Sequence, residues 1–404
     1  MVAVVGLTFV AAALAANQRW LDRHFLPSFF LPRHWYVLVE GTVRAAVAST
    51  GVLLAVVSRQ WIGRAIGRAP GLALLVLMAV AAALGTSEIV LRQSEPRPSE
   101  WQRPDEEPLR LTDPLTGWVV APSRTGRRLF GGRVVEYAID SAGYRVRRAD
   151  EPVDPASPTI VFAGESVMFG EGLEWSETVP AQVGAMLSIQ SANLAVHGYT
   201  NDQVYLRLKK ELPRFRQPLA VVTLFMTALF GRNLDKDRPY LTYSLGPHAG
   251  TPSRWTTRDG DPAPQALGSG APGAGFLPSS PELGWVWHPA EHGSRLRSLA
   301  EFLVPYRSEQ TVESGITRTR EVLRATVELA RCRGATPLIV VPQFGSEDRL
   351  EASLRTRVLD ETMPSLIVTI DEDWHLPWDR HPNARAAHAI AVEVAARLRQ
   401  ELRP

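Results

Sequence analysis

Residues 158–404 alternate between two hydrophobic patterns, and this alternation constrains the fold more than any other feature. Continuous apolar runs predict strands of a parallel sheet that is buried on both faces, and they lie at residues 159–163, 192–196, 219–225, 337–341 and 366–370. Segments with apolar residues at every third or fourth position predict helices, and they lie at residues 179–187, 202–212, 313–332 and 390–402. Strands that alternate with helices predict an α/β fold, a three-layer α/β/α sandwich around a parallel sheet.

The N-terminal part of the chain is far more apolar than the rest and predicts transmembrane helices. Residues 35–57 and 71–91 are each long enough to cross a hydrocarbon core of roughly 30 Å. Residues 2–16 are apolar but short, and no positive region precedes them, so they predict a short first span rather than a signal peptide. We therefore expect a transmembrane region of two to three helices over residues 1–92.

Charged residues around these segments bear on their orientation. Segment 17–34 and loop 58–69 each contain three arginines, and loop 58–69 is shorter and contains no acid, so we expect it to be cytoplasmic. The part of the chain after residue 92 would then lie on the periplasmic or other extracytoplasmic side of a multi-pass inner-membrane protein. Glu40 and Arg44, four positions apart, could pair on one helix face or extend toward the membrane surface.

Composition shifts divide the remainder of the chain. Residues 93–112, rich in proline and charge, predict a linker. Residues 113–157 predict a small β-rich lead-in that contains a hairpin around Gly131-Gly132. Residues 158–404 form the main predicted domain, with a long insertion at about 236–312 where the alternation of strands and helices lapses.

Charge and cysteine content exclude several classes of function. The chain has 44 basic and 42 acidic side chains, a net charge of +2, without the clustered basic charge that nucleic-acid binding requires. A single cysteine, Cys332, excludes a disulfide framework and a cysteine-based zinc site, and we expect it to be a buried, inert thiol. Asp371 and Asp373 have no nearby histidine cluster and predict solvated acids, so we expect no metal and no cofactor.

Polar residues follow several of the predicted strands, where the carboxyl ends of a parallel sheet form a common edge. A serine directly after a strand is more often a helix N-cap than a nucleophile. Here, however, the late Asp379-Arg-His381 can supply a base and the group that orients it, which favours a nucleophilic Ser166. The residues expected at this edge are Ser166, Gly198, Asn201, Arg232, Asn233, Asp379 and His381.

These segments resemble the motif blocks of the SGNH/GDSL hydrolase superfamily. Gly164-Glu-Ser166 resembles its Gly-Asp-Ser block, with Glu165 in place of the usual aspartate. Asn193–Gly198 resembles the second block, and Asp379–Asn383 resembles the last. The resemblance covers about residues 110–404, is closest to membrane-tethered bacterial members, and implies a flavodoxin-like order of the parallel strands.

The resemblance also implies a role for each of these residues. Ser166 would be the nucleophile, His381 the general base, and Asp379 the carboxylate that orients the imidazole. Backbone N–H groups of Ser166 and Gly198 would form the oxyanion hole. His197, next to Gly198, could line the site or lie at the surface.

The third block of the family, Gly-x-Asn-Asp, is missing from its expected place. Ala228 stands where the oxyanion asparagine should be, and it has no side-chain donor. Asn233 could fill the role from a shifted position, or Thr227 could contribute. Because one oxyanion donor contributes about 3–4 kcal/mol to transition-state stabilisation, its absence would slow an enzyme considerably.

The function that this resemblance implies is that of a membrane-anchored serine esterase. Its partners would be acylated small molecules or polysaccharides, and hydrolysis of O-acetyl esters on an envelope or exported polysaccharide is the leading hypothesis. An O-acyltransferase acting on the same glycans is an alternative. A catalytically inactive glycan-binding or scaffold subunit is another, because of the imperfect third block.

Overall fold

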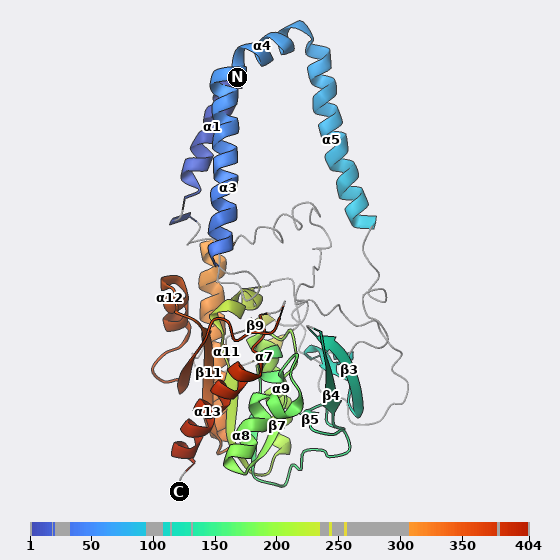
Figure 1. Cartoon of the computed structure of the whole chain (residues 1–404), viewed down its shortest axis with the longest axis vertical. Coiled ribbons are helices and arrows are strands. Elements are labelled where there is room, and N and C mark those ends of the chain that lie inside the picture. Colours follow the sequence, from blue (N-terminus) through green and yellow to red (C-terminus); the bar gives the residue numbers. More distant parts are fainter. Residues whose placement is uncertain are drawn as a thin grey trace. The chain divides into compact units, whose positions relative to one another are not determined.

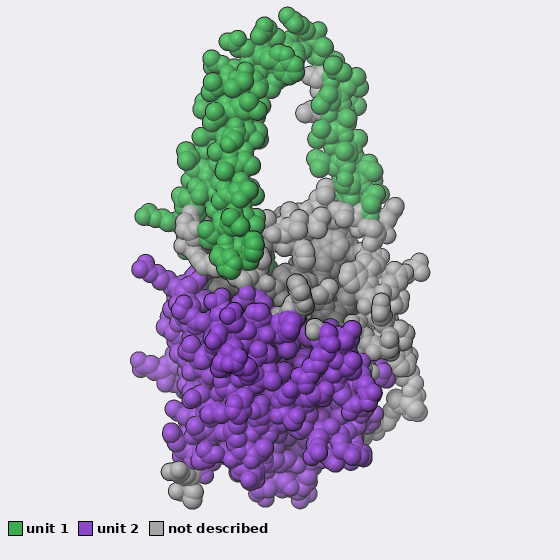
Figure 2. All heavy atoms as spheres, viewed as in Figure 1, with its two compact units in different colours: residues 1–96, 287–312 green, residues 97–286, 313–404 purple. Residues whose placement is uncertain are grey.

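The computed structural model describes residues 2–17, 19–20, 33–93, 108–113, 115–130, 132–234, 242–244, 254–256, 307–377 and 380–402. Asp379 and most of the predicted insertion lie outside these residues. The chain divides into two compact units (Figure 2). One contains the N-terminal helices, and the other contains the sheet with its flanking helices.

The N-terminal unit is entirely helical in its described part. Two stretches, Val37–Arg68 and Pro70–Val90, are long and apolar enough to cross a membrane by length and composition. The predicted span 71–91 matches the second stretch, whereas the predicted span 35–57 ends 11 residues before the first stretch does. Placement in a membrane stays a prediction. The helices are α1 (Val2–Ala15), α3 (Arg33–Val52), the π-helical η1 (Leu53–Ser58), α4 (Arg59–Arg68) and α5 (Pro70–Gln93).

The expected loop 58–69 is wrong, because residues 59–68 form helix α4. Helix α4 continues directly from η1, and it ends at Arg68, two residues before Pro70, whose ring disfavours helical geometry at Ala69. Proline is then tolerated as the first residue of α5, where its missing N–H is not needed. The break between the two long helical stretches is therefore a single residue.

Helix α1 packs closely against α3 through glycine. A Cβ atom on Gly6 would lie 2.5 Å from the carbonyl oxygen of Gly51, so the two backbones touch. Such small-residue contacts are typical of helices that pack in membranes. Arg44 pairs with Glu40 at 3.2 Å, which is the first of the two arrangements expected, and its Nε also donates to the Ala13 carbonyl at 2.9 Å.

The second unit is built on an eight-stranded mixed sheet (Figure 1). Five strands are parallel, and numbered along the chain they lie in the spatial order 2-1-3-4-5, the flavodoxin-like order. The expected parallel sheet is confirmed. These strands are β6 (Thr159–Phe162), β7 (Gln190–Asn193), β8 (Pro218–Leu224), β11 (Thr336–Phe344) and β12 (Ser365–Ile370).

Helices flank this sheet in two groups that pack separately. Helix α8 packs against α13, while α9 packs against α11 through an apolar cluster of Tyr205, Leu206, Val322 and Ala325. Crossovers between parallel strands are right-handed in nearly all proteins, and in this strand order that rule puts the two groups on opposite faces, as the three-layer prediction requires. The predicted helices are confirmed as α8 (Val179–Leu187), α9 (Asn201–Glu211), α11 (Glu309–Cys332) and α13 (Ala384–Glu401).

The lead-in segment contributes to the same sheet. Strands β3 (Arg124–Phe130) and β4 (Arg133–Ile139) form the hairpin expected around Gly132. Strand β5 (Arg145–Val146) pairs with both β4 and β7, so the antiparallel strands extend the parallel sheet. Separate two-stranded ladders are formed by β1 (Arg110–Asp113) with β2 (Gly117–Val120), and by β9 (Thr242–Ser244) with β10 (Arg254–Thr256).

Strand β7 begins and ends earlier than expected. Its ladder spans residues 190–193 rather than 192–196. The chain nevertheless stays beside β6, because the Leu194 N–H donates to the Phe162 carbonyl and the Val196 N–H donates to the Gly164 carbonyl. The loop that follows β7 is therefore held next to the turn that follows β6.

Candidate active site

Ser166 stands at a tight turn between β6 and the short helix α7 (Ser166–Phe169). Gly164 permits this turn, because a Cβ atom there would lie 2.6 Å from the Cβ of Met168. The N-cap of α7 is Glu165, whose Oε2 accepts the Val167 N–H at 3.2 Å. The alternative interpretation of Ser166 as an N-cap is therefore wrong, and its hydroxyl is available for other contacts.

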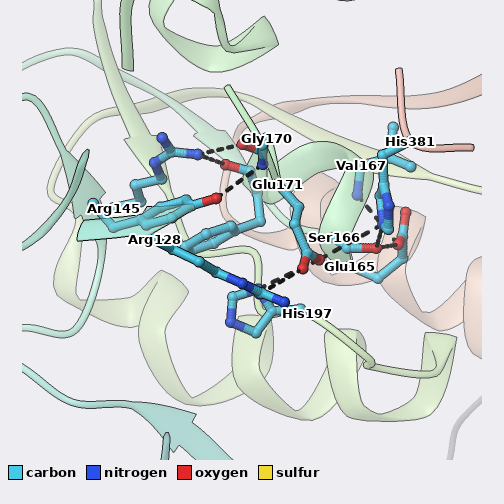
Figure 3. A network of polar contacts seen from close by, with 12 residues as sticks. Arg128, Arg145, Glu165, Ser166, Val167, Gly170, Glu171, His197 and His381 are labelled. Atoms are coloured by element: carbon cyan, nitrogen blue, oxygen red, sulfur yellow. Dashed lines mark hydrogen bonds and ion pairs between the residues drawn. The ribbon is translucent and has the colours of Figure 1, made fainter. Parts of the chain in front are cut away.

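The hydroxyl of Ser166 contacts the imidazole of His381. The distance from Ser166 Oγ to His381 Nε2 is 2.7 Å, and both side chains are buried (Figure 3). His381 lies on the loop between β12 and α13, where its carbonyl accepts the Leu376 N–H and its ring makes a T-shaped contact with the Phe130 ring. The chain thus brings together two of the three residues predicted for catalysis, while Asp379 lies outside the described residues.

Glu165 makes a second contact to the same hydroxyl, one that sequence reasoning missed. Ser166 Oγ lies 2.6 Å from Glu165 Oε2, and Arg232 Nη1 lies 3.8 Å from that oxygen. A hydroxyl has one proton, so Glu165 and His381 compete for it. In the resting site Ser166 can donate to Glu165 and accept from His381, whereas attack on an ester requires the proton on the His381 side.

A second carboxylate, that of Glu171, lies near the same nitrogen of His381 that Ser166 contacts. Its Oε2 is 3.6 Å from His381 Nε2 and its Oε1 is 3.1 Å from Arg128 Nη1 (Figure 3). Arg128 comes from the edge strand β3, so the lead-in hairpin reaches the site. Neither residue was expected here, because no motif marks them and they are far apart in the sequence.

His197 lines this cluster from the loop after β7. It is 2% exposed, its ring packs against Phe169, and its Nδ1 is 3.9 Å from Glu171 Oε2. Burial lowers the pKa of His197 well below 6.5, and the positive charges of Arg110 and Arg128 lower it further. His197 is therefore neutral near pH 7, and its contact with Glu171 is not an ion pair.

Arg145 fixes the segment that carries Glu171. Its guanidinium is buried and donates to the carbonyls of Phe169 at 2.8 Å, Gly170 at 2.6 Å and Leu173 (Figure 3). It also stacks over the ring of Tyr137 at 4.6 Å. Burial lowers the pKa of Arg145 to about 10, so the charge persists at neutral pH. One side chain thereby holds the backbone of residues 169–173, the segment that contains Glu171.

Gly198 adopts a conformation that suits glycine. Its φ is +76°, and a Cβ atom would lie 3.3 Å from the indole of Trp118. The Trp118 Nε1–H donates to the His197 carbonyl at 3.1 Å, so the β1–β2 hairpin holds this loop. The Val196 N–H bonded to the Gly164 carbonyl brings the same loop beside the turn that carries Ser166.

Asn233 is engaged in a network within the protein. Its Nδ2 donates to Asn201 Oδ1 at 2.8 Å and to Thr319 Oγ1 at 3.1 Å. Its Oδ1 accepts the Asn201 N–H at 3.2 Å. Because both amide protons are already donated, Asn233 would have to give up one of these bonds to serve as an oxyanion donor.

Other residues singled out in the sequence lie away from Ser166. His388, on α13, has its Nδ1 2.6 Å from Gln182 Oε1, and Asp371 and Asp373 are exposed, as expected. Cys332 is exposed, so the expectation of a buried thiol is wrong; it is the last residue of α11, where the helix reaches solvent. Among the described residues no group of three or more histidine, cysteine or acidic side chains could hold a metal ion.

Strand order and the positions of these side chains decide the type of fold. Ser166 follows the first parallel strand, Gly198 follows the second, and His381 follows the last, at the carboxyl edge of a 2-1-3-4-5 sheet. The domain has a flavodoxin-like α/β fold. Its short turn between β6 and α7 presents Ser166 to His381.

No family model and no curated protein matches this sequence. Among solved structures, a G-D-S-L family lipolytic protein from Desulfitobacterium hafniense has 12% identity and a TM-score of 0.33, over 59% of this chain and 98% of that chain. A GDSL-like lipase from Bacteroides thetaiotaomicron has 12% identity and a TM-score of 0.31, over 60% and 88%. An acetyl xylan esterase from Butyrivibrio proteoclasticus has 12% identity and a TM-score of 0.31, over 62% and 66%.

Proposed function

We propose that this chain is a membrane-anchored serine esterase of the SGNH/GDSL type that hydrolyses O-acyl esters. The observation that carries the proposal is the 2.7 Å contact between Ser166 Oγ and His381 Nε2 at the carboxyl edge of the sheet. A nucleophile within hydrogen-bond reach of its base is the geometry that acyl transfer requires. The two long, apolar helical stretches at the N-terminus support the proposal that the chain is anchored in a membrane.

The proposed mechanism follows from this contact. His381 Nε2 takes the proton of Ser166 as Oγ bonds to the ester carbonyl carbon. The carbonyl oxygen becomes an oxyanion, which backbone N–H groups of Ser166 and Gly198 would stabilise. Collapse breaks the ester C–O bond, and His381 returns the proton to the departing alcohol. Water then repeats the sequence on the acyl-enzyme, with Asp379 proposed to hold the imidazole throughout.

The proposed substrate is an acetyl ester of an envelope or exported polysaccharide. The predicted orientation, which places the domain outside the cytoplasmic membrane, supports it. A reporter that is active only in the cytoplasm, fused to the C-terminus, is expected to stay silent. A cytoplasmic signal would contradict this placement and with it the extracellular glycan.

The test of the function uses the full-length chain in detergent micelles. We expect hydrolysis of 4-nitrophenyl acetate and covalent labelling by a fluorophosphonate probe that maps to Ser166. Acyl transfer to an added oligosaccharide that exceeds hydrolysis would favour the O-acyltransferase. Glycan binding without turnover or labelling would favour the scaffold subunit. That alternative is consistent with Asn233, whose amide protons are both donated within the protein and are not available to an oxyanion.

Replacing Gly198 by alanine tests the proposed oxyanion loop. The positive φ and the crowding against Trp118 are expected to cost about 1–2 kcal/mol of unfolding free energy. Displacement of the backbone N–H should lower kcat/KM by about tenfold or more. Gly132→Ala is the control, because Gly132 has a φ of +84° with no atom within 4 Å of the added Cβ. Equal loss of activity in both variants would contradict the proposed role of Gly198.

A further inference from the structure

A carboxylate faces the nitrogen of His381 that would receive the proton. Glu171 Oε2 lies 3.6 Å from His381 Nε2, beyond a hydrogen bond but within range of a strong charge interaction. Ser166 Oγ approaches the same nitrogen from α7 at 2.7 Å. The proposed orienting carboxylate, Asp379, would by contrast serve Nδ1. Glu171 is thus placed where the imidazolium charge develops.

The charge of Glu171 is shared with Arg128. Arg128 Nη1 is 3.1 Å from Glu171 Oε1, and its guanidinium lies 5.2 Å from the ring centroid of Phe130. The Phe130 ring also makes a T-shaped contact with the His381 ring. Strand β3 therefore supplies both a cation that offsets Glu171 and a ring that packs against the histidine.

The other charged groups near His381 do not take over the role of Glu171 and Arg128. His197, on the β7 loop, is kept neutral by burial. Glu165, at the N-cap of α7, shares its Oε2 with Ser166 Oγ and lies 3.8 Å from Arg232 of the 3₁₀ turn η4 (Thr227–Leu234). Arg145 is occupied by backbone carbonyls behind Glu171. Glu171 is the described carboxylate that an ion-pair distance links directly to His381.

We propose that Glu171 is a positioning residue that stabilises the protonated form of His381 from the Nε2 side, and that Arg128 sets how strongly it does so. Its relevance to catalysis rests on the proposed esterase function. Strand β3 would then tune the base, because the Arg128 cation offsets the pull of Glu171 on the imidazolium and favours the neutral form of His381.

Two substitutions should move the titration of His381 in opposite directions. Glu171→Gln removes the carboxylate, so His381 should titrate about one pH unit lower. Arg128→Met removes the offsetting cation, so His381 should titrate at higher pH. Arg127→Met is the matched control, since Arg127 is the neighbouring residue on β3, is 73% exposed and pairs with Glu136 instead. It should cause no shift.

NMR of the full-length chain, isotopically labelled at histidine, measures this titration without any substrate. His381→Gln assigns the signal among the nine histidines. Equal shifts, shifts of the same sign, or no shift in Glu171→Gln and Arg128→Met would overturn the proposal. If one variant fails to fold, the direction of the His381 shift in the other variant tests the proposal. Arg128→Lys keeps the positive charge, so His381 should titrate in this variant as it does in the unmodified chain.

Kinetics separate this proposal from the esterase function. If the chain hydrolyses 4-nitrophenyl acetate, the acid limb of kcat/KM should move with the NMR titration in both variants. If opposite shifts occur in a chain without hydrolysis or labelling, the charge coupling stands and the proposed function fails. If hydrolysis is present and the shifts are absent, the function stands and the role of Glu171 fails.

Discussion

Ser166→Ala is expected to lower kcat/KM for an aryl acetate by a factor of about 10⁴ to 10⁶. Alanine leaves the turn at Gly164 and the N-cap at Glu165 in place, because neither depends on the serine hydroxyl. The loss should therefore appear in kcat, with the fold unchanged. Initial rates with the full-length protein in detergent, together with its circular dichroism spectrum, measure both.

His381→Ala should cause a loss of similar size, since the two residues act on one proton. The double variant should lose no more than either single variant, because removing one member already removes the activated nucleophile. His388→Ala provides the control, as His388 contacts Gln182 rather than Ser166. A Ser166→Ala variant that keeps a tenth of the activity would contradict the assignment of the nucleophile.

Arg145→Met is expected to lower the free energy of unfolding by about 3–5 kcal/mol. The buried guanidinium donates to the carbonyls of Phe169, Gly170 and Leu173, and methionine would fill a similar volume without satisfying any of them. The Leu173 carbonyl would lose the Arg145 donor, and a buried carbonyl without a donor costs about 1–3 kcal/mol. The carbonyls of Phe169 and Gly170 would keep their bonds from Asn193 Nδ2 at 3.3 Å and from the Leu173 N–H at 3.1 Å, but would lose the bond from the charged guanidinium. Urea unfolding followed by tryptophan fluorescence, with the protein in detergent micelles, measures the change.

Arg147→Met is the control for this experiment, because Arg147 is exposed just after β5. Its effect should stay within about 0.5 kcal/mol, as for most surface substitutions. Arg145→Met should also reduce hydrolysis beyond its effect on stability, since the segment it holds carries Glu171. A change in stability as small as that of Arg147→Met would show that the three carbonyl contacts contribute little.

The sequence predicted the parallel sheet well because its strands are continuous apolar runs with helical segments between them. Helix α12 (Arg349–Val358) was missed, although Leu350, Leu354 and Val358 recur at every fourth position as in the helices that were predicted. Helix α4 was taken for a loop because its arginines were interpreted as a polar connection. In both elements the helical spacing was present, but the many charged residues between the apolar ones drew attention away from it.

The contact between Ser166 and His381 was predictable because both residues belong to recognisable blocks that stand next to element ends. Their catalytic roles stay predictions. Glu171 and Arg128 form an ion pair between segments 43 positions apart in the sequence, which no local pattern encodes. Glu165 was noticed only as a departure from an aspartate, and its contact with Ser166 was not predicted. Asp379 stays a prediction.

The pairing of Arg145 with Asn193 joins the lead-in and the main domain into one hydrogen-bonded sheet. A gene fragment that began at residue 158 would therefore encode a protein whose β7 edge is open to intermolecular pairing. It would also lack the two arginines that brace the neighbourhood of the serine. A domain that is transferred to another protein must therefore include all residues from about 108 onward if it is to keep its activity.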